Sequence, residues 1–153
     1  MAPVESTEAV RQEVKTLIFG QKLAVLSTDC RGQPYASLLA FAGTADLRHL
    51  VFATPRTTRK FANLSDNPKV ALLINSGTNT DADIHRAAAV TATGTAEVLP
   101  AGGEGGLLNL YLEKHPHLRD FALSPTTALV RVTVTRYTLV KRFQNVTDLE
   151  LSP

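Results

Sequence analysis

The alternation of side chains between positions 129 and 143 constrains the fold of this chain more than any other feature of its sequence. Valine occupies positions 130, 132 and 134, and the positions between and after them hold Arg131, Thr133, Thr135 and Arg136. A period of two residues is typical of a β-strand that buries one face and exposes the other to solvent. The pattern therefore predicts a long strand at residues 128–143.

Shorter β-type segments precede this strand, and turn residues separate them. Strands are predicted at residues 23–28 and 34–42, which form a hairpin, and at residues 49–54, 69–74 and 86–98. Gly94 interrupts the last of these segments and predicts a bend there. Because six strands with hairpin connections favour a closed antiparallel barrel, the predicted fold class is mostly β with flanking helices.

Three helices are expected around these strands. Residues 1–20 place Val10, Val14, Leu17 and Ile18 on one face, with Ser6 as the N-cap. A short helix is predicted at residues 58–65, before Pro68, and another at residues 107–115, before Pro116. The connection at residues 100–106 contains four glycines and is expected to be flexible.

Size and charge narrow the function classes. A chain of 153 residues with 44% apolar residues can bury one core, so a single domain over residues 1–153 is expected. The 16 basic and 14 acidic side chains leave a net charge of only +2, which disfavours nucleic acid as a partner. Cys30 is the only cysteine, and no apolar run approaches the roughly 20 residues of a membrane helix. We therefore expect a cytoplasmic protein with no membrane partner.

Residues 52–61 combine the end of an apolar strand with hydroxyls and cations at the start of a helix. Thr57 or Thr58 is placed to cap this helix, whose first N–H groups have no partner within it. Arg59 and Lys60 add positive charge at the same point. Because the N-termini of helices attract anions, this segment predicts a phosphate-binding turn that needs no glycine-rich loop.

The sequence offers no clear constellation of catalytic or metal-ligating residues. His49, His85, His115 and His117 lack the spacing that places two metal ligands on one helix face. No nucleophile with a base partner and no pair of carboxylates at a defined spacing is evident. We therefore expect no metal site, and the sequence assigns no catalytic residue.

The order of these segments resembles that of the FMN-binding split barrel, the superfamily of pyridoxamine 5'-phosphate oxidase and its relatives. The resemblance is carried by residues 26–35, 36–40, 52–60 with 67–73, and 90–98. It implies a six-stranded antiparallel split β-barrel of the FMN-binding type, with its flavin-binding core at residues 22–98 and its closing strand at residues 128–143. It also implies a homodimer, because the flavin ring in this fold generally lies at a two-fold interface.

The resemblance places the cofactor FMN on seven residues. The phosphate contacts fall on Thr54, Thr58, Arg59 and Lys60, and the ribityl chain and ring edge lie along Ser37, Leu38 and Leu39. Such a protein needs neither a triad nor a metal, because hydride or electron transfer is the chemistry of the flavin itself. The implied function is an oxidoreductase that acts on a small-molecule redox substrate.

Departures from the oxidase itself leave alternatives open. The oxidase has an arginine and a lysine on the strand where this chain has Ser37 and Ala42, and this chain contains no tryptophan. The resemblance is therefore to the shorter relatives, some of which bind FMN, some haem and some the deazaflavin F420. A non-enzymatic flavin-binding protein or electron carrier is the second hypothesis, and a haem or F420 binder is the third.

Overall fold

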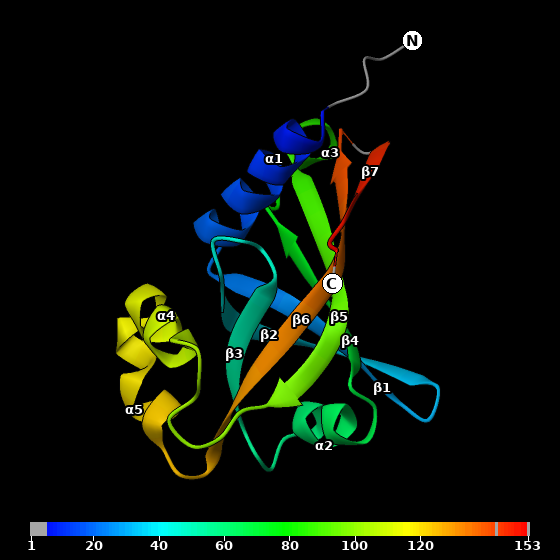
Figure 1. Cartoon of the computed structure of the whole chain (residues 1–153). Helices are drawn as coiled ribbons and strands as arrows, with labels where there is room; N and C mark the ends of the chain where they lie inside the picture. Colours follow the sequence, from blue (N-terminus) through cyan, green and yellow to red (C-terminus); the bar gives the residue numbers. More distant parts are fainter. Residues whose placement is uncertain (1–5, 143, 153) are drawn as a thin grey trace.

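A closed antiparallel barrel forms the core of the computed structural model, which describes residues 6–142 and 144–152 (Figure 1). The strands are β1 (Leu23–Cys30), β2 (Gln33–Gly43), β3 (His49–Pro55), β4 (Lys69–Asn75), β5 (Ala88–Val98) and β6 (Thr127–Lys141). Their order is β3-β2-β1-β4-β5-β6, and β6 pairs back onto β3. The six-stranded antiparallel barrel is confirmed. Predictions that concern residues 1–5, 143 and 153 lie outside the described residues.

The first hairpin follows from the two residues between β1 and β2. The strands pair as far as Cys30 and Gln33, which leaves Arg31 and Gly32 as the loop. Both loop residues have positive φ angles, 51° and 87°, as a two-residue turn of type I′ requires. The Asp29 carboxylate accepts the Gly32 N–H at 3.0 Å, which adds a side-chain hydrogen bond to the turn.

Strand β6 shares one of its edges between two neighbours. Its first half pairs with β3, and its second half pairs with a short additional strand, β7 (Asn145–Glu150). The three valines of the alternating pattern are buried in the barrel, so the predicted burial of one face is confirmed. The strand begins at Thr127 and ends at Lys141, two residues before the predicted end.

Gly94 lies at an irregularity of β5. The register between β5 and β6 shifts between Thr93 and Gly94, which leaves Thr135 of β6 as the extra residue of a β-bulge. A Cβ atom on Gly94 would lie 2.2 Å from the carbonyl oxygen of Thr133. The two backbones therefore approach so closely that only glycine fits.

Helices surround the barrel, with α1 over its upper part, α2 at its foot, and α4 and α5 along one flank (Figure 1). They are α1 (Thr7–Gly20), α2 (Arg59–Asp66), α3 (Asp83–Arg86), α4 (Leu107–Lys114) and α5 (Arg119–Leu123), with a 3-10 turn at Pro116–Leu118. The predicted face of α1 is buried. The Ser6 hydroxyl accepts the Ala9 N–H at 3.1 Å, which confirms Ser6 as the N-cap.

A second apolar cluster joins α4 and α5 to the outside of β3. Its buried members are Ala42, Val51, Ala53, Leu99, Leu107, Tyr111 and Leu129. Strand β3 is therefore buried on both faces, which explains why its sequence is a continuous apolar run instead of an alternating one.

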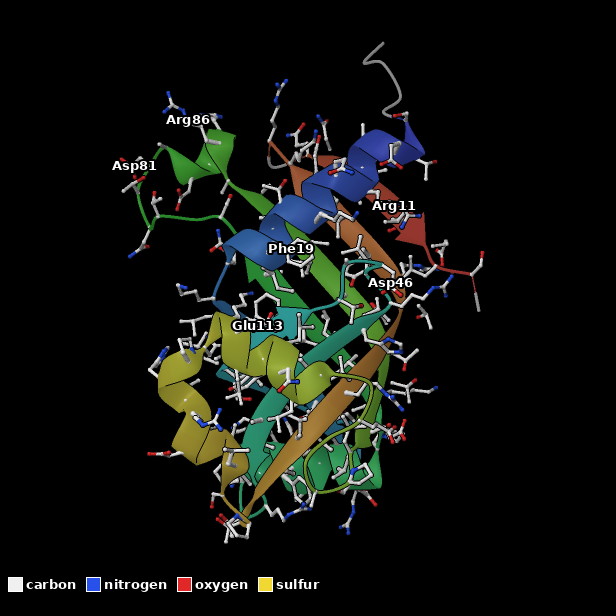
Figure 2. The ribbon with its side chains drawn as sticks, turned by 60° about the vertical axis from the view of Figure 1, so that its left-hand side comes forward. Arg11, Phe19, Asp46, Asp81, Arg86 and Glu113 are labelled. Atoms are coloured by element: carbon white, nitrogen blue, oxygen red, sulfur yellow. The ribbon has the colours of Figure 1, made fainter. Side chains whose placement is uncertain are left out.

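Lys114 and His115 hold the end of α4 against β2. Lys114 Nζ donates to the Ile18 carbonyl oxygen at 2.9 Å and lies 4.0 Å from the centre of the Phe41 ring. The His115 Nε2 atom lies 2.7 Å from the Phe41 carbonyl oxygen, and burial lowers the pKa of His115. Glu113, the residue before this pair, lies on the side of α4 that is near Phe19 of α1 (Figure 2). These contacts fix α4 to both α1 and the barrel.

Lys114 makes the stability of the protein depend on pH. Burial, together with the charge of Lys22, lowers the pKa of Lys114 from 10.5 to about 8. Between these values the unfolded chain binds more protons than the folded chain, so the free energy of unfolding rises with pH across this window. The expected rise is about 1 to 2 kcal/mol for a half-buried ammonium, and Lys114→Met removes it. Urea unfolding of both proteins across the window measures the difference, and parallel curves would contradict the prediction.

The sequence predicted neither α3, α5 nor β7. These elements contain four, five and six residues, which is too short for a periodic apolar pattern to stand out. In β7 only Leu149 is buried. The position of β7 therefore depends on backbone pairing with β6 rather than on an apolar face of its own.

Candidate functional site

The predicted phosphate-binding segment forms the connection between β3 and α2, residues 54–60, which we call the β3–α2 turn. Strand β3 ends at Pro55, and α2 begins at Arg59 with Thr58 as its N-cap. The Thr58 hydroxyl accepts the Phe61 N–H at 3.3 Å. The N–H groups of Arg59 and Lys60 occupy the first two helical positions, which have no acceptor within a helix. The turn therefore presents backbone donors at the start of a helix.

Two threonine hydroxyls lie together within the turn. The Oγ1 atoms of Thr54 and Thr58 are 2.8 Å apart. Both hydroxyls also reach the Pro55 carbonyl oxygen, at 3.2 and 3.1 Å. Thr54 is only 1% exposed, whereas Thr58 is half-buried. Thr54 thus supports the turn from the interior of the protein. Of the two hydroxyls, that of Thr58 is the one that a ligand from solvent can reach.

Arg59 and Lys60 place two positive charges at the start of α2. Neither forms an ion pair with an acidic side chain in the described part of the chain, and the first turn of α2 contains no acid. The guanidinium carbon of Arg59 lies 5.4 Å from the centre of the Tyr35 ring, a cation–π contact. Unpaired positive charge beside the N-terminus of a helix is the electrostatic environment of an anion site.

Strands β2 and β3 separate next to this turn. They pair only over residues 41–43 and 50–52. The rest of β2 pairs with β1 alone, and the rest of β3 pairs with β6 alone. The contact between Arg59 and Tyr35 links α2 to the separated half of β2. This opening is the split of the barrel, and the β3–α2 turn lies beside it (Figure 1).

Ser37 lies on the separated half of β2. Its Oγ atom is buried and has no hydrogen-bond partner among the described residues. A buried hydroxyl without a partner is unusual in a folded protein. Tyr35, which contacts Arg59, lies two residues before Ser37 and so on the same face of the strand. The residues at the split therefore fit a ligand that carries a phosphate and can bond to this hydroxyl.

The structure brings four of the seven predicted cofactor residues into one turn. The other three lie on two faces of β2, because Leu39 is 8% exposed on the face of Ser37 whereas Leu38 is 64% exposed on the opposite face. Side chains on opposite faces of a strand cannot line one side of a ligand. The contact predicted for Leu38 therefore requires a partner on the outer face of the barrel.

Tyr35 and Asn63 are two residues of this region that the sequence did not single out. They line a cavity of about 230 Å³ together with Cys30, Gln33 and Arg59. The Asn63 side-chain amide donates to the Thr28 hydroxyl at 3.1 Å in the interior, which holds α2 against β1. No local pattern marks Asn63, since its partner is far away in the sequence, but the alternation along β2 places Tyr35 on the face of Ser37.

The described residues provide no cluster of metal ligands. No group of three or more His, Cys, Asp or Glu side chains in them could hold a metal ion. The ring of His115 is buried against the backbone of β2, so it is not free to bind a haem iron. Within the same residues, no helix combines the length and apolar character needed to cross a membrane.

The structure is thus a split antiparallel barrel in which the third strand leads into a helix that begins with a capping threonine and two cations. The sequence profile of the pyridoxamine 5'-phosphate oxidase family matches residues 10–141. The chain belongs to this family.

Comparisons with individual proteins agree with this assignment. The chain is 27% identical over 143 residues to a Schizosaccharomyces pombe protein named as a pyridoxamine 5'-phosphate oxidase homolog, covering 76% of this chain and 74% of the relative. A haem-binding protein of Mycobacterium smegmatis superposes with a TM-score of 0.80 at 18% identity, over 97% of this chain and 60% of that chain. A FAD-binding protein of Mesorhizobium loti superposes with a TM-score of 0.66 at 18% identity, over 84% and 90%. At these identities the two structures are evidence for the fold.

Proposed function

We propose that the protein is an FMN-dependent oxidoreductase that holds the FMN phosphate at the β3–α2 turn and acts on a small-molecule redox substrate. The observation that carries this proposal is the unpaired charge of Arg59 and Lys60 at the first turn of α2. A phosphate at this point would accept hydrogen bonds from backbone N–H groups, from Thr58 and from both cations. The family assignment and the FAD-binding structural relative support a flavin.

The residues of the chain would bind and orient the flavin. When bound, the flavin supplies the hydride or electron transfer. Thr58, Arg59 and Lys60 would hold its phosphate, and the unpartnered hydroxyl of Ser37 would bond to the ligand at the split. The ring of Tyr35 keeps the Arg59 guanidinium beside β2, which limits the number of side-chain conformations that binding has to restrict.

We propose further that two copies of the chain associate through the outer face of β2, β1 and β4. Val25 is paired with both Leu38 and Leu73, so these three side chains form a row across the strands. Leu38 is 64% exposed, Leu73 40%, and Leu23 on the same face of β1 51%. A contiguous apolar patch of this kind is typical of a surface that a partner covers. A second copy here would also cover Leu38, the predicted flavin residue that faces outward.

Leu73→Glu is expected to convert the dimer to a monomer. The substitution places one carboxylate from each copy against an apolar face, so the dimer dissociation constant should rise at least about 100-fold. Sedimentation velocity over a concentration series measures the change. Val146→Glu is the matched control, because Val146 is 62% exposed on β7, outside this face. A monomeric wild-type protein, or a dimer that withstands Leu73→Glu, would contradict the proposal.

The visible absorption spectrum of the protein, recorded after incubation with FMN and gel filtration, tests the cofactor. A retained flavin spectrum with one FMN per chain is expected. If the protein loses all FMN on the column but retains haem or F420 in parallel trials, FMN is not its cofactor and the retained group takes its place. The description of the fold would not change.

Turnover separates the oxidoreductase from a flavin carrier. The loaded protein is expected to oxidise NADH or NADPH faster than the same concentration of free FMN. Tight FMN binding without turnover with any acceptor tried would favour a non-enzymatic flavin-binding protein or electron carrier.

A further inference from the structure

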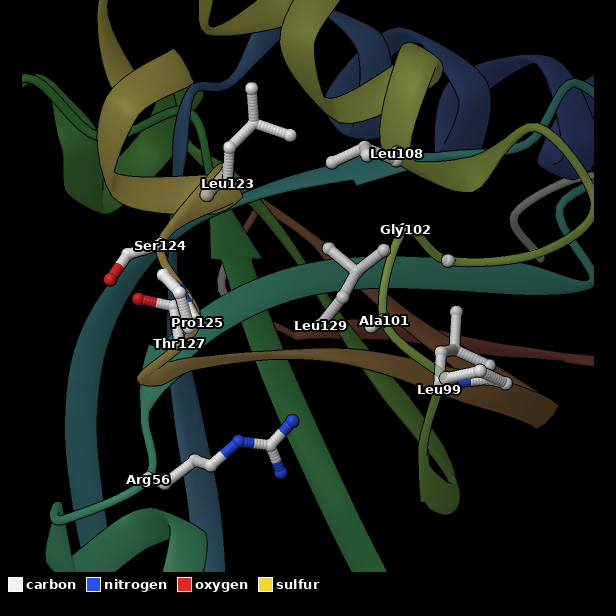
Figure 3. Close-up of a pocket in the computed structure, with 13 residues that line it drawn as sticks. Arg56, Leu99, Ala101, Gly102, Leu108, Leu123, Ser124, Pro125, Thr127 and Leu129 are labelled. Carbon is white, nitrogen blue, oxygen red and sulfur yellow. The ribbon is translucent and has the colours of Figure 1, made fainter.

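A small cavity lies where the glycine-rich connection meets the start of β6 (Figure 3). Its volume is about 100 Å³, which is room for about three water molecules. The walls come from residues 99–103, from Leu108 of α4, from the end of α5 and from the residues that lead into β6. None of the seven predicted cofactor residues lines it, and it touches the β3–α2 turn only at Arg56.

Apolar side chains outnumber polar ones in the lining. Leu99 and Leu129 are 3% and 7% exposed, and the remaining apolar side chains are Pro100, Ala101, Leu108, Ala122, Leu123 and Pro125. A Cβ atom on Gly103 would lie 2.9 Å from Leu129 Cδ2, so the backbone of the connection itself closes one side. The interior therefore suits a short alkyl group.

Hydrogen bonds and an ion pair hold the rim in place. The N–H groups of Leu99 and Gly103 donate to the carbonyl oxygens of Leu129 and Pro100, each at 2.8 Å. Glu104 follows in the connection, and its Oε1 atom lies 3.2 Å from Nη1 of Arg131 on β6. The cavity is therefore preformed, as small-molecule sites usually are.

The polar groups of the lining are Arg56, Ser124 and Thr127. Arg56 is its only charged residue, and it forms no ion pair with any acidic side chain that the structure describes. Its backbone N–H donates to the Thr126 carbonyl oxygen at 2.9 Å, which fixes the arginine beside the turn that precedes β6. In Figure 3, Arg56 lies away from Leu108, and its guanidinium carbon is 5.8 Å from the centre of the Phe61 ring of α2. The site thus combines an apolar interior with a single cation.

We propose that this cavity binds a short-chain carboxylic acid, with its alkyl chain among the leucines and its carboxylate on the Arg56 guanidinium. A planar carboxylate matches the fork of donors that a guanidinium presents. A neutral ligand would leave the arginine without a counter-ion, and a cationic ligand would be repelled by it. The volume limits the chain to a few carbon atoms. This binding does not depend on the proposed flavin function.

Titration of the isotopically labelled protein with sodium butyrate, followed by amide NMR, tests the site. We expect shifts of amides at residues 99–103 and 122–129 and a dissociation constant on the order of 1 mM. Butanol and butylamine, which have the same carbon chain, should bind at least about tenfold more weakly at matched ionic strength. Equal binding of butanol, or the absence of shifts in these segments, would overturn the proposal.

Two substitutions separate the cation from the cavity. Arg56→Gln should weaken butyrate binding about tenfold, whereas Arg119→Gln, which removes the same charge from α5 outside the lining, should leave it unchanged. Ala122→Leu should fill the cavity and abolish the shifts, with Ala101→Leu as the replacement if the first variant does not fold. Butyrate binding that survives both Arg56→Gln and a folded cavity-filling variant would overturn the assignment. So would inorganic phosphate that competes with butyrate at equal concentration, because the arginine would then serve a phosphate site.

Discussion

Replacing Arg59 and Lys60 together by alanine is expected to weaken the binding of FMN by about 2 to 4 kcal/mol, or roughly 30-fold to 1000-fold in the dissociation constant. The variant removes two charge-assisted hydrogen bonds to the phosphate. It leaves the Thr58 cap, because the cap bonds to the Phe61 backbone. Fluorescence quenching of FMN on binding measures the affinity of both proteins.

A control with the same loss of charge distinguishes local contacts from the general field of the protein. Lys15→Ala combined with Arg86→Ala removes two cations from α1 and α3, which lie at the other end of the barrel from α2 (Figure 1). This control is expected to keep the affinity for FMN within about twofold, since screening weakens distant charges. If both double variants lose the same affinity for FMN, or if neither loses any, the β3–α2 turn is not the phosphate site.

Gly94→Ala is expected to destabilise the fold by about 3 to 5 kcal/mol, a large effect for the addition of one methyl group. The new Cβ atom would lie 2.2 Å from the Thr133 carbonyl oxygen and 2.9 Å from its carbonyl carbon. The obstacle is backbone within a paired strand, which cannot rotate away as a flexible side chain can. Urea unfolding measures the loss, and proteolysis of the purified variant detects it if the protein does not remain folded.

Gly20→Ala is the matched control for this substitution. Gly20 is the last residue of α1, and a Cβ atom there meets nothing within 4 Å. Because alanine is favoured over glycine in a helix, this variant should be neutral or more stable by up to about 1 kcal/mol. Similar stabilities of Gly94→Ala and Gly20→Ala would show that the bulge tolerates a side chain and that the close approach of β5 and β6 does not exclude one.

The sequence was sufficient for the barrel because local patterns and tertiary burial agree there. The valines of β6 alternate in the sequence and are buried in the structure. The hairpin predicted from residues 23–28 and 34–42 turns at Arg31 and Gly32, which have the positive φ angles of a two-residue loop. By contrast, β7 has one buried residue, and its existence depends on an edge of β6 that β3 leaves free. A strand that forms only because a distant strand has a free edge leaves no local pattern in the sequence.

The β3–α2 turn could be predicted from the sequence for a similar reason. A capping threonine followed by two cations is a contiguous signal, and the structure selects Thr58 as the cap. The surroundings of the turn depend on contacts between distant segments. Neither the ring of Tyr35 beside Arg59 nor the unpartnered hydroxyl of Ser37 could be derived before β2 and α2 were placed together.

The closure of the barrel by β6 also determines when the β3–α2 turn is completed during synthesis. Thr54 pairs with Ala128, and the Arg56 N–H donates to the carbonyl oxygen of Thr126. A ribosome releases the chain from its N-terminus, so the turn emerges long before the strand that anchors it. A nascent chain therefore carries an incomplete turn, and under the proposed function FMN would meet the finished turn only after β6 has left the ribosome.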